Sequence, residues 1–156
     1  MANAITFDIE RRVDDLGQLE FVPVVDGVNL TDRIHSFERE AGMETRERSY
    51  GGLIPAFFRF GPALDHYLAG TAAAGEGRIV LLGCGDCGEW GCWPLTAELV
   101  VAGETVTWQG FLQPHRPDRD YSGFGPFVFE RSEYARAVAA VAAAWHEASS
   151  TEPTPE

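Results

Sequence analysis

Residues 78–116 read RIVLLGCGDCGEWGCWPLTAELVVAGETVTWQGFLQPHR and hold every cysteine of the chain. The apolar run at the start of this stretch predicts a buried strand over residues 78–83. Apolar and polar residues alternate over 93–101 and again over 105–112, which predicts a hairpin. We therefore expect a strand, a glycine-rich cysteine loop and a hairpin to follow one another, with the rest of the chain arranged around them.

The remaining segments add short strands and helices. Period-two patterns and turn signals predict strands over residues 4–12, 19–25, 28–30 and 124–130. Capping and breaking residues predict helices from Thr31 or Asp32 to Gly42, from Pro62 to Gly70 and from Glu133 to Ala148. The last helix carries an apolar stripe, which predicts a face buried in the core: Tyr134, Val138, Val141 and Trp145.

These elements predict the fold class and the domain organisation. We expect an α+β fold, with a mainly antiparallel sheet of about six strands and the C-terminal helix packed on one face. A chain of 156 residues with 45% hydrophobic composition fits a single core. We therefore expect one domain over residues 1–148, and a disordered tail over the polar residues 149–156.

The charge balance indicates which partners the protein binds. The formal net charge is -12 at pH 7, which disfavours nucleic acids because binding to phosphates needs clustered cations. We therefore expect an unknown protein, of basic character, or a small ligand as the partner. The residues Arg116, Asp118, Arg119 and Asp120 are expected to form solvated ion pairs of little energetic value.

The sequence predicts a cytoplasmic protein that does not enter a membrane. Residues 1–12 lack a cationic start followed by an apolar core, so they do not resemble a signal peptide. No apolar run reaches the length of a membrane span. Three cysteines, an odd number packed within nine residues, also do not form a secreted disulfide framework.

The glycine pattern of the cysteine loop resembles a nucleotide-binding loop, but its surroundings do not fit that function. Residues 83–88 (GCGDCG) match the G-x-G-x-x-G pattern of dinucleotide-binding proteins and of some methyltransferases. Both kinds of site need a helix that begins at the third glycine, because its N–H groups hold the ligand. Residues 89–94 (EWGCWP) cannot start a stable helix, so we expect no nucleotide cofactor.

The cysteine spacing also fits a zinc site. A C-x2-C pair followed by glycine resembles a zinc knuckle, in which two thiolates are supported by a tight turn. The candidate ligands are Cys84, Cys87, Cys92 and His115. Acidic residues inside the loop disfavour bare thiolates, whereas a divalent cation would offset their charge. A second C-x2-C pair is missing from the chain.

Two other interpretations of the three cysteines stay open. A C-x2-C pair can close as a disulfide, which would suit a redox centre, although the loop contains no cation to lower the thiol pKa. Alternatively, the cysteines are small buried thiols in a tight loop beside core tryptophans.

The segments LLGCGDCGEWGCWPL, WQGFLQPHR and FGPFVFERSEY resemble a family of uncharacterised bacterial proteins. All three lie in the last half of the chain. The resemblance implies a compact α+β domain in a bacterial protein. It implies no catalytic residues, because no activity is known for that family.

Two functions follow from these patterns. The first is a non-enzymatic binding or interaction protein, in which the cysteine loop could hold a structural zinc ion. The alternative is a thiol-dependent oxidoreductase centred on Cys84, Cys87 and Cys92.

Overall fold

The computed structural model describes residues 2–11, 19–43, 50–52, 78–84 and 94–151, and for residues 10, 11, 19, 84 and 145–151 it describes the backbone alone. In chain order the described elements are β1 (Ile5–Arg11), β2 (Leu19–Val25), β3 (Val28–Asn29), α1 (Leu30–Glu40), β4 (Tyr50–Gly51), β5 (Arg78–Cys84), β6 (Leu95–Ala102), β7 (Thr105–Leu112), β8 (Phe127–Glu130) and α3 (Arg131–Thr151). The predicted helix from Pro62 to Gly70 lies outside the described residues.

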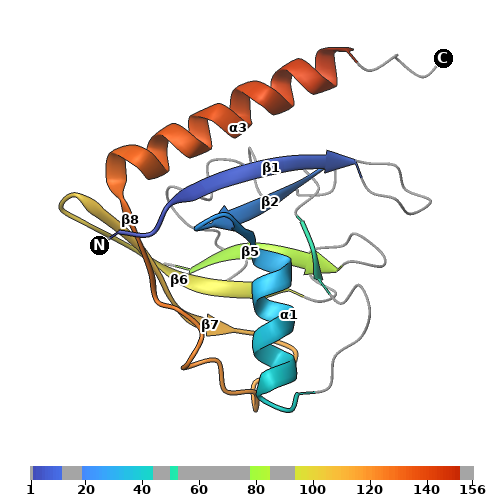
Figure 1. Cartoon of the computed structure of the whole chain (residues 1–156), viewed down its shortest axis with the longest axis vertical. Helices are drawn as coiled ribbons and strands as arrows, with labels where there is room; N and C mark the ends of the chain where they lie inside the picture. The colour runs from blue at the N-terminus through green and yellow to red at the C-terminus, as the bar shows by residue number, and fades with distance from the viewer. Residues whose placement is uncertain (1, 12–18, 44–49, 53–77, 85–93, 152–156) are drawn as a thin grey trace.

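The strands form two antiparallel sheets, which confirms the predicted α+β class. One sheet has the order β1-β2-β3 and the other has the order β4-β5-β6-β7-β8. We expected a single sheet of about six strands. The described residues instead form eight strands in two sheets. Figure 1 shows α3 running along β1 at the top of the view, with α1 in the lower half.

The two sheets are connected at two places, one at each edge of the five-stranded sheet. At one edge, the Asn3 N–H donates to the Val128 carbonyl at 2.6 Å, and the Val128 N–H donates to Asn3 Oδ1 at 2.8 Å. At the other, the Gly52 N–H donates to Glu20 Oε2 at 3.0 Å. A Cβ at Gly52 would lie 2.4 Å from the Phe21 carbonyl oxygen, so only glycine fits this approach. The strands therefore enclose one continuous core.

The three-stranded sheet contains the three strands that the sequence predicted over the first 30 residues. Strand β1 pairs with β2 from Ile5–Val25 to Arg11–Leu19, and β2 continues into β3 through a tight turn. Asp26 has a positive φ of 51°, and its carboxylate accepts hydrogen bonds from the Ala4 N–H and from Asn3 Nδ2, both at 2.7 Å. These hydrogen bonds lower the pKa of Asp26.

Helix α1 starts earlier than predicted and buries an acidic residue. Its N-cap is Asn29, whose side chain accepts from the Thr31 N–H at 2.9 Å, so the predicted caps Thr31 and Asp32 were wrong. The buried positions are Leu30, Ile34 and Glu38, at i, i+4 and i+8 on one helical face. The helix therefore turns a carboxylate towards the core, while Ala41 at its C-cap is exposed.

The predicted hairpin is β6–β7, but a bulge changes the side chains that it buries. The pairing shifts between Thr96–Leu112 and Glu98–Gln109, which leaves one extra residue in β7. Gly110 has a φ of 55°, a conformation that suits a glycine bulge. Because of that extra residue, Phe111 is buried, whereas Leu112 is only half-buried.

Helix α3 covers the core as predicted, with different ends. Tyr134, Val138 and Val141 are buried, which confirms these three positions of the predicted stripe. The side chain of Trp145 lies outside the described residues. The helix begins at Arg131 and continues to Thr151, so residues 149–151 of the predicted tail are helical.

Beneath α3 lies an aromatic group that we call the Trp108 cluster: Trp108, Phe129 and Tyr134. The Trp108 and Phe129 rings stack edge to face with centroids 4.8 Å apart, and Trp108 Nε1 donates to the Tyr134 hydroxyl at 3.2 Å.

No helix among the described residues is long and apolar enough to span a membrane.

Candidate functional site

The strand registers bring several chain segments to the same end of the five-stranded sheet. Leu82 pairs with Leu95, so β5 ends beside the start of β6. Thr96 pairs with Leu112, so β7 ends beside that same point. The last residue of β5 and the segment after β7 therefore leave the sheet at the same end, with β6 between their strands. We call this region the sheet end.

The structure places part of the predicted metal site at the sheet end. Cys84 is the last residue of β5, and its backbone pairs with Tyr50 of β4. Cys87 and Cys92 lie outside the described residues. His115 is exposed just after β7, and its backbone N–H donates to Gln113 Oε1 at 3.0 Å. Among the described residues there is no group of three His, Cys, Asp or Glu side chains that could hold a metal. The four-ligand zinc site thus stays a prediction.

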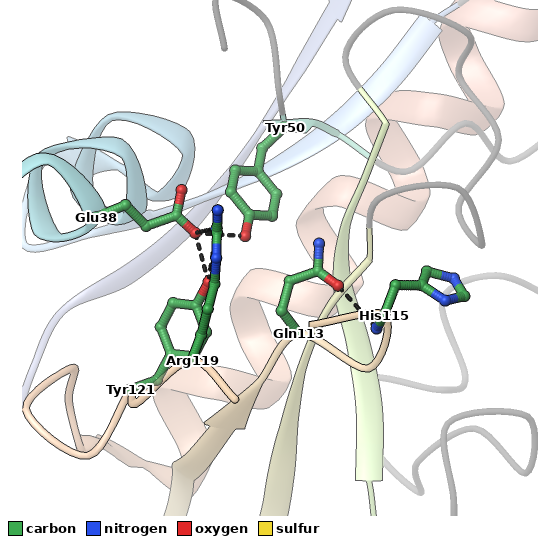
Figure 2. A network of polar contacts seen from close by, with 6 residues as sticks. All are labelled: Glu38, Tyr50, Gln113, His115, Arg119 and Tyr121. Carbon is green, nitrogen blue, oxygen red and sulfur yellow. Dashed lines mark hydrogen bonds and ion pairs between the residues drawn. The ribbon is translucent and has the colours of Figure 1, made fainter. Parts of the chain in front are cut away.

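A buried carboxylate lies at the same sheet end. Glu38 of α1 is 0% exposed, and its Oε2 atom accepts hydrogen bonds from the Tyr50 hydroxyl at 2.7 Å and the Tyr121 hydroxyl at 2.5 Å. Arg119 Nη1 lies 3.1 Å from the same oxygen, and its side chain is 13% exposed. Figure 2 shows these three side chains converging on Glu38. We call these four residues the Glu38 cluster.

The cluster ties together segments that are distant in the sequence. Glu38 comes from a helix, Tyr50 from the edge strand β4, and Arg119 and Tyr121 from the segment between β7 and β8. A buried carboxylate is tolerated because charge-assisted hydrogen bonds replace its lost hydration. The cluster therefore fixes α1 and the segment after β7 against β4.

The same burial controls the protonation of the two tyrosines. Burial raises the pKa of Tyr50, and the hydrogen bond with Tyr121 and the charge of Glu38 raise it further. Burial also raises the pKa of Tyr121, and its hydrogen bond to Glu38 acts in the same direction. Both hydroxyls therefore stay protonated as donors to the carboxylate, which makes the cluster an anchor rather than a source of reactive phenolate.

Two buried polar atoms at this end of the molecule have no hydrogen-bond partner among the residues that the structure describes. One is Glu38 Oε1, and the other is Nε2 of Gln113, a residue that is 0% exposed. In Figure 2 the amide nitrogen of Gln113 points away from His115. Such atoms are rare in native proteins because each carries a desolvation cost.

The Glu38 cluster was missed in the sequence, and Arg119 was interpreted wrongly. Arg119 was expected in a solvated ion pair, whereas its partner Glu38 is fully buried. One signal was present: Glu38 continues the spacing of Leu30 and Ile34 on the buried face of the helix. An acid at that position predicts a buried partner, but the sequence does not show which cation or hydroxyl supplies it.

No protein-family model matches the chain, and no curated protein or solved structure does either.

Proposed function

We propose that this chain is a non-enzymatic binding protein whose cysteine loop holds a structural zinc ion at the sheet end. The proposal rests on one observation: β5 and β7 end at the same end of the five-stranded sheet. The registers bring the last residue of β5, Cys84, to the end of the sheet from which the segment carrying His115 departs. Residues far apart in the sequence can therefore contribute ligands to one ion.

The proposed ligand set is that of a structural zinc site. Cys84, Cys87, Cys92 and His115 supply three thiolates and one imidazole, and four protein ligands complete a tetrahedral zinc shell. Structural sites are closed in this way, whereas catalytic zinc keeps one position for water or substrate. The ligand set therefore supports a role in shaping a binding surface rather than in catalysis.

The charge of the chain supports a class of partner. With a net charge of -12, the protein attracts basic protein surfaces and repels nucleic acids. The Glu38 cluster adds a fixed scaffold at the sheet end, because it joins α1 to β4. A preorganised surface loses less conformational entropy when a partner binds.

Metal content and spectroscopy test the zinc site together with its closed shell. Protein purified without chelator should contain about one zinc per chain, and chelator should lower the melting temperature, because metal binding is coupled to folding. Cys87→Ser should reproduce that loss. The cobalt-substituted protein should show a tetrahedral spectrum that added cyanide or imidazole does not change.

The other outcomes separate the alternatives. A cobalt spectrum that shifts with added ligand would reveal an open coordination position and overturn the non-enzymatic role. If the protein contains no zinc and a reductant reversibly changes its count of free thiols, the thiol-dependent oxidoreductase becomes the better description. Three thiols that react only on denaturation, with no metal, would identify buried structural cysteines.

A further inference from the structure

We infer that Tyr50 is a positioning residue for Cys84, and that the Glu38 cluster acts on the cysteine site through it. The inference rests on the proposed function, because it assigns residues that hold one of the proposed ligands in place. Its physical basis is the backbone pairing of Tyr50 with Cys84 in the register of β4 and β5.

Strand β4 is too short to hold its own position. It comprises Tyr50 and Gly51, which pair with Cys84 and Gly83. Two paired residues make few ladder hydrogen bonds, and even complete isolated hairpins are marginally stable in water. Among the described residues, the position of β4 beside Cys84 is therefore fixed mainly by contacts of its side chains and of its flanking residue.

The Tyr50 side chain supplies the first of these contacts. It is 8% exposed, and its hydroxyl donates to Glu38 Oε2 at 2.7 Å. The same oxygen accepts from Tyr121 and lies beside Arg119, and Glu38 itself stands on a helix of three turns. The acceptor is thus held from three sides, so the hydroxyl of Tyr50 is anchored to a rigid element (Figure 2).

Gly52 supplies the second contact, from the opposite sheet. Its N–H donates to Glu20 Oε2 at 3.0 Å, and its Cα lies so close to β2 that an added Cβ would meet the Phe21 carbonyl at 2.4 Å. Residues 50–52 are therefore fixed both to α1 and to β2. Cys84 lies directly across from the first residue of this fixed segment.

Two tyrosine variants separate positioning from stability. Tyr50→Phe and Tyr121→Phe each remove one hydroxyl that donates to the same Glu38 oxygen, and both tyrosines are buried. In metal-free protein, their melting temperatures should therefore fall by similar amounts. Only Tyr50 pairs with Cys84, so only Tyr50→Phe should disturb the cysteine site.

The first readout is zinc affinity, measured by competition with a chromophoric chelator. Residues that support metal ligands typically change affinity by about 10- to 100-fold when mutated. We expect Tyr50→Phe to weaken zinc binding by about tenfold, and Tyr121→Phe by less than about twofold. Equal losses in both variants, or none in Tyr50→Phe, would overturn the inference while leaving the zinc site itself intact.

The second readout does not depend on zinc. In metal-free protein, the rate at which iodoacetamide modifies Cys84 is measured by mass spectrometry of the peptide that contains it. Tyr50→Phe should speed this modification several-fold, whereas Tyr121→Phe should leave it at the wild-type rate. If the wild type binds no zinc, the proposed metal site fails, but these rates still decide whether Tyr50 positions Cys84. Matching rates in the two variants would refute the positioning role.

Discussion

The Trp108 cluster and the Glu38 cluster are two buried groups that contain tyrosine, but different interactions hold them together. Trp108 and Tyr134 share one hydrogen bond between neutral groups at 3.2 Å, inside edge-to-face aromatic packing. In the Glu38 cluster, two tyrosines and an arginine are arranged around a fully buried carboxylate. Both groups contain buried tyrosine, but only the second contains buried charge.

The difference shows how the molecule separates stability from positioning. Apolar packing is favourable through buried area and contact alone, and it tolerates neutral hydrogen bonds. A buried ion pair pays a desolvation cost that often cancels its attraction, so it adds little net stability. Its geometry is nonetheless strict, because each donor must stay at hydrogen-bond distance. The Trp108 cluster therefore stabilises the fold, and the Glu38 cluster sets the positions of α1, β4 and the segment after β7.

The largest effect should come from the apolar cluster. Trp108 is fully buried, so Trp108→Ala should lower the free energy of unfolding by about 4 kcal/mol through lost burial and the cavity that it leaves. Urea denaturation measures this loss. The same assay on Trp145→Ala tests the sequence-based prediction of a buried stripe, since that residue should lose about 3–5 kcal/mol if its side chain is fully buried. A Trp108→Ala loss below about 1 kcal/mol would contradict the packing seen here.

Removal of the central carboxylate should have the next largest effect. Glu38→Ala leaves two buried hydroxyls and Arg119 without their acceptor, and it should cost about 3 kcal/mol. Glu40→Ala, an exposed acid on the same helix, is the matched control and should change stability by less than about 0.5 kcal/mol. If the two variants lose the same stability, Glu38 is not the centre of a buried network.

Alkaline pH should distinguish the clusters by the number of tyrosines that each contains. Burial raises the pKa of Tyr134, as it does for Tyr50 and Tyr121, although the hydrogen bond from Trp108 opposes the shift. The unfolded chain ionises these hydroxyls near pH 10 while the folded protein keeps their protons. Stability is therefore complete below about pH 10 and falls above it, by about 1.4 kcal/mol per pH unit for each tyrosine.

Urea denaturation between about pH 9 and pH 11 measures that slope. The double variant Tyr50→Phe with Tyr121→Phe should flatten it more than Tyr134→Phe does. Equal flattening would mean that one tyrosine of the Glu38 cluster ionises normally in the folded protein.

The smallest effect should come from the neutral hydroxyl. Tyr134→Phe removes an acceptor for Trp108 Nε1 and should cost about 1 kcal/mol, since neutral hydrogen bonds contribute that much. Tyr121→Phe should cost about 2 kcal/mol in the same assay, because its acceptor is charged. The reverse order would show that the Glu38 cluster does not depend on charge-assisted hydrogen bonds.

The strands and the last helix could be predicted because their patterns are local. The strand over residues 19–25 matches β2 residue for residue, and the stripe of Tyr134, Val138 and Val141 is buried as expected. The hairpin was also predicted, but its bulge was not, since Gly110 at a φ of 55° looks in sequence like any strand glycine. The extra residue moved Phe111 into the core, which a strict alternation cannot anticipate.

The sequence by itself determined the antiparallel α+β class, the apolar faces of the elements and the position of the cysteine loop between β5 and β6. These properties follow from periodicity over a few neighbouring residues, which records the side of each element that avoids water. Only the tertiary structure decided that Glu38 is buried, because its partners Tyr50 and Tyr121 are 12 and 83 residues away. A carboxylate leaves water only where such donors surround it, and no local pattern encodes donors that the fold brings from so far along the chain.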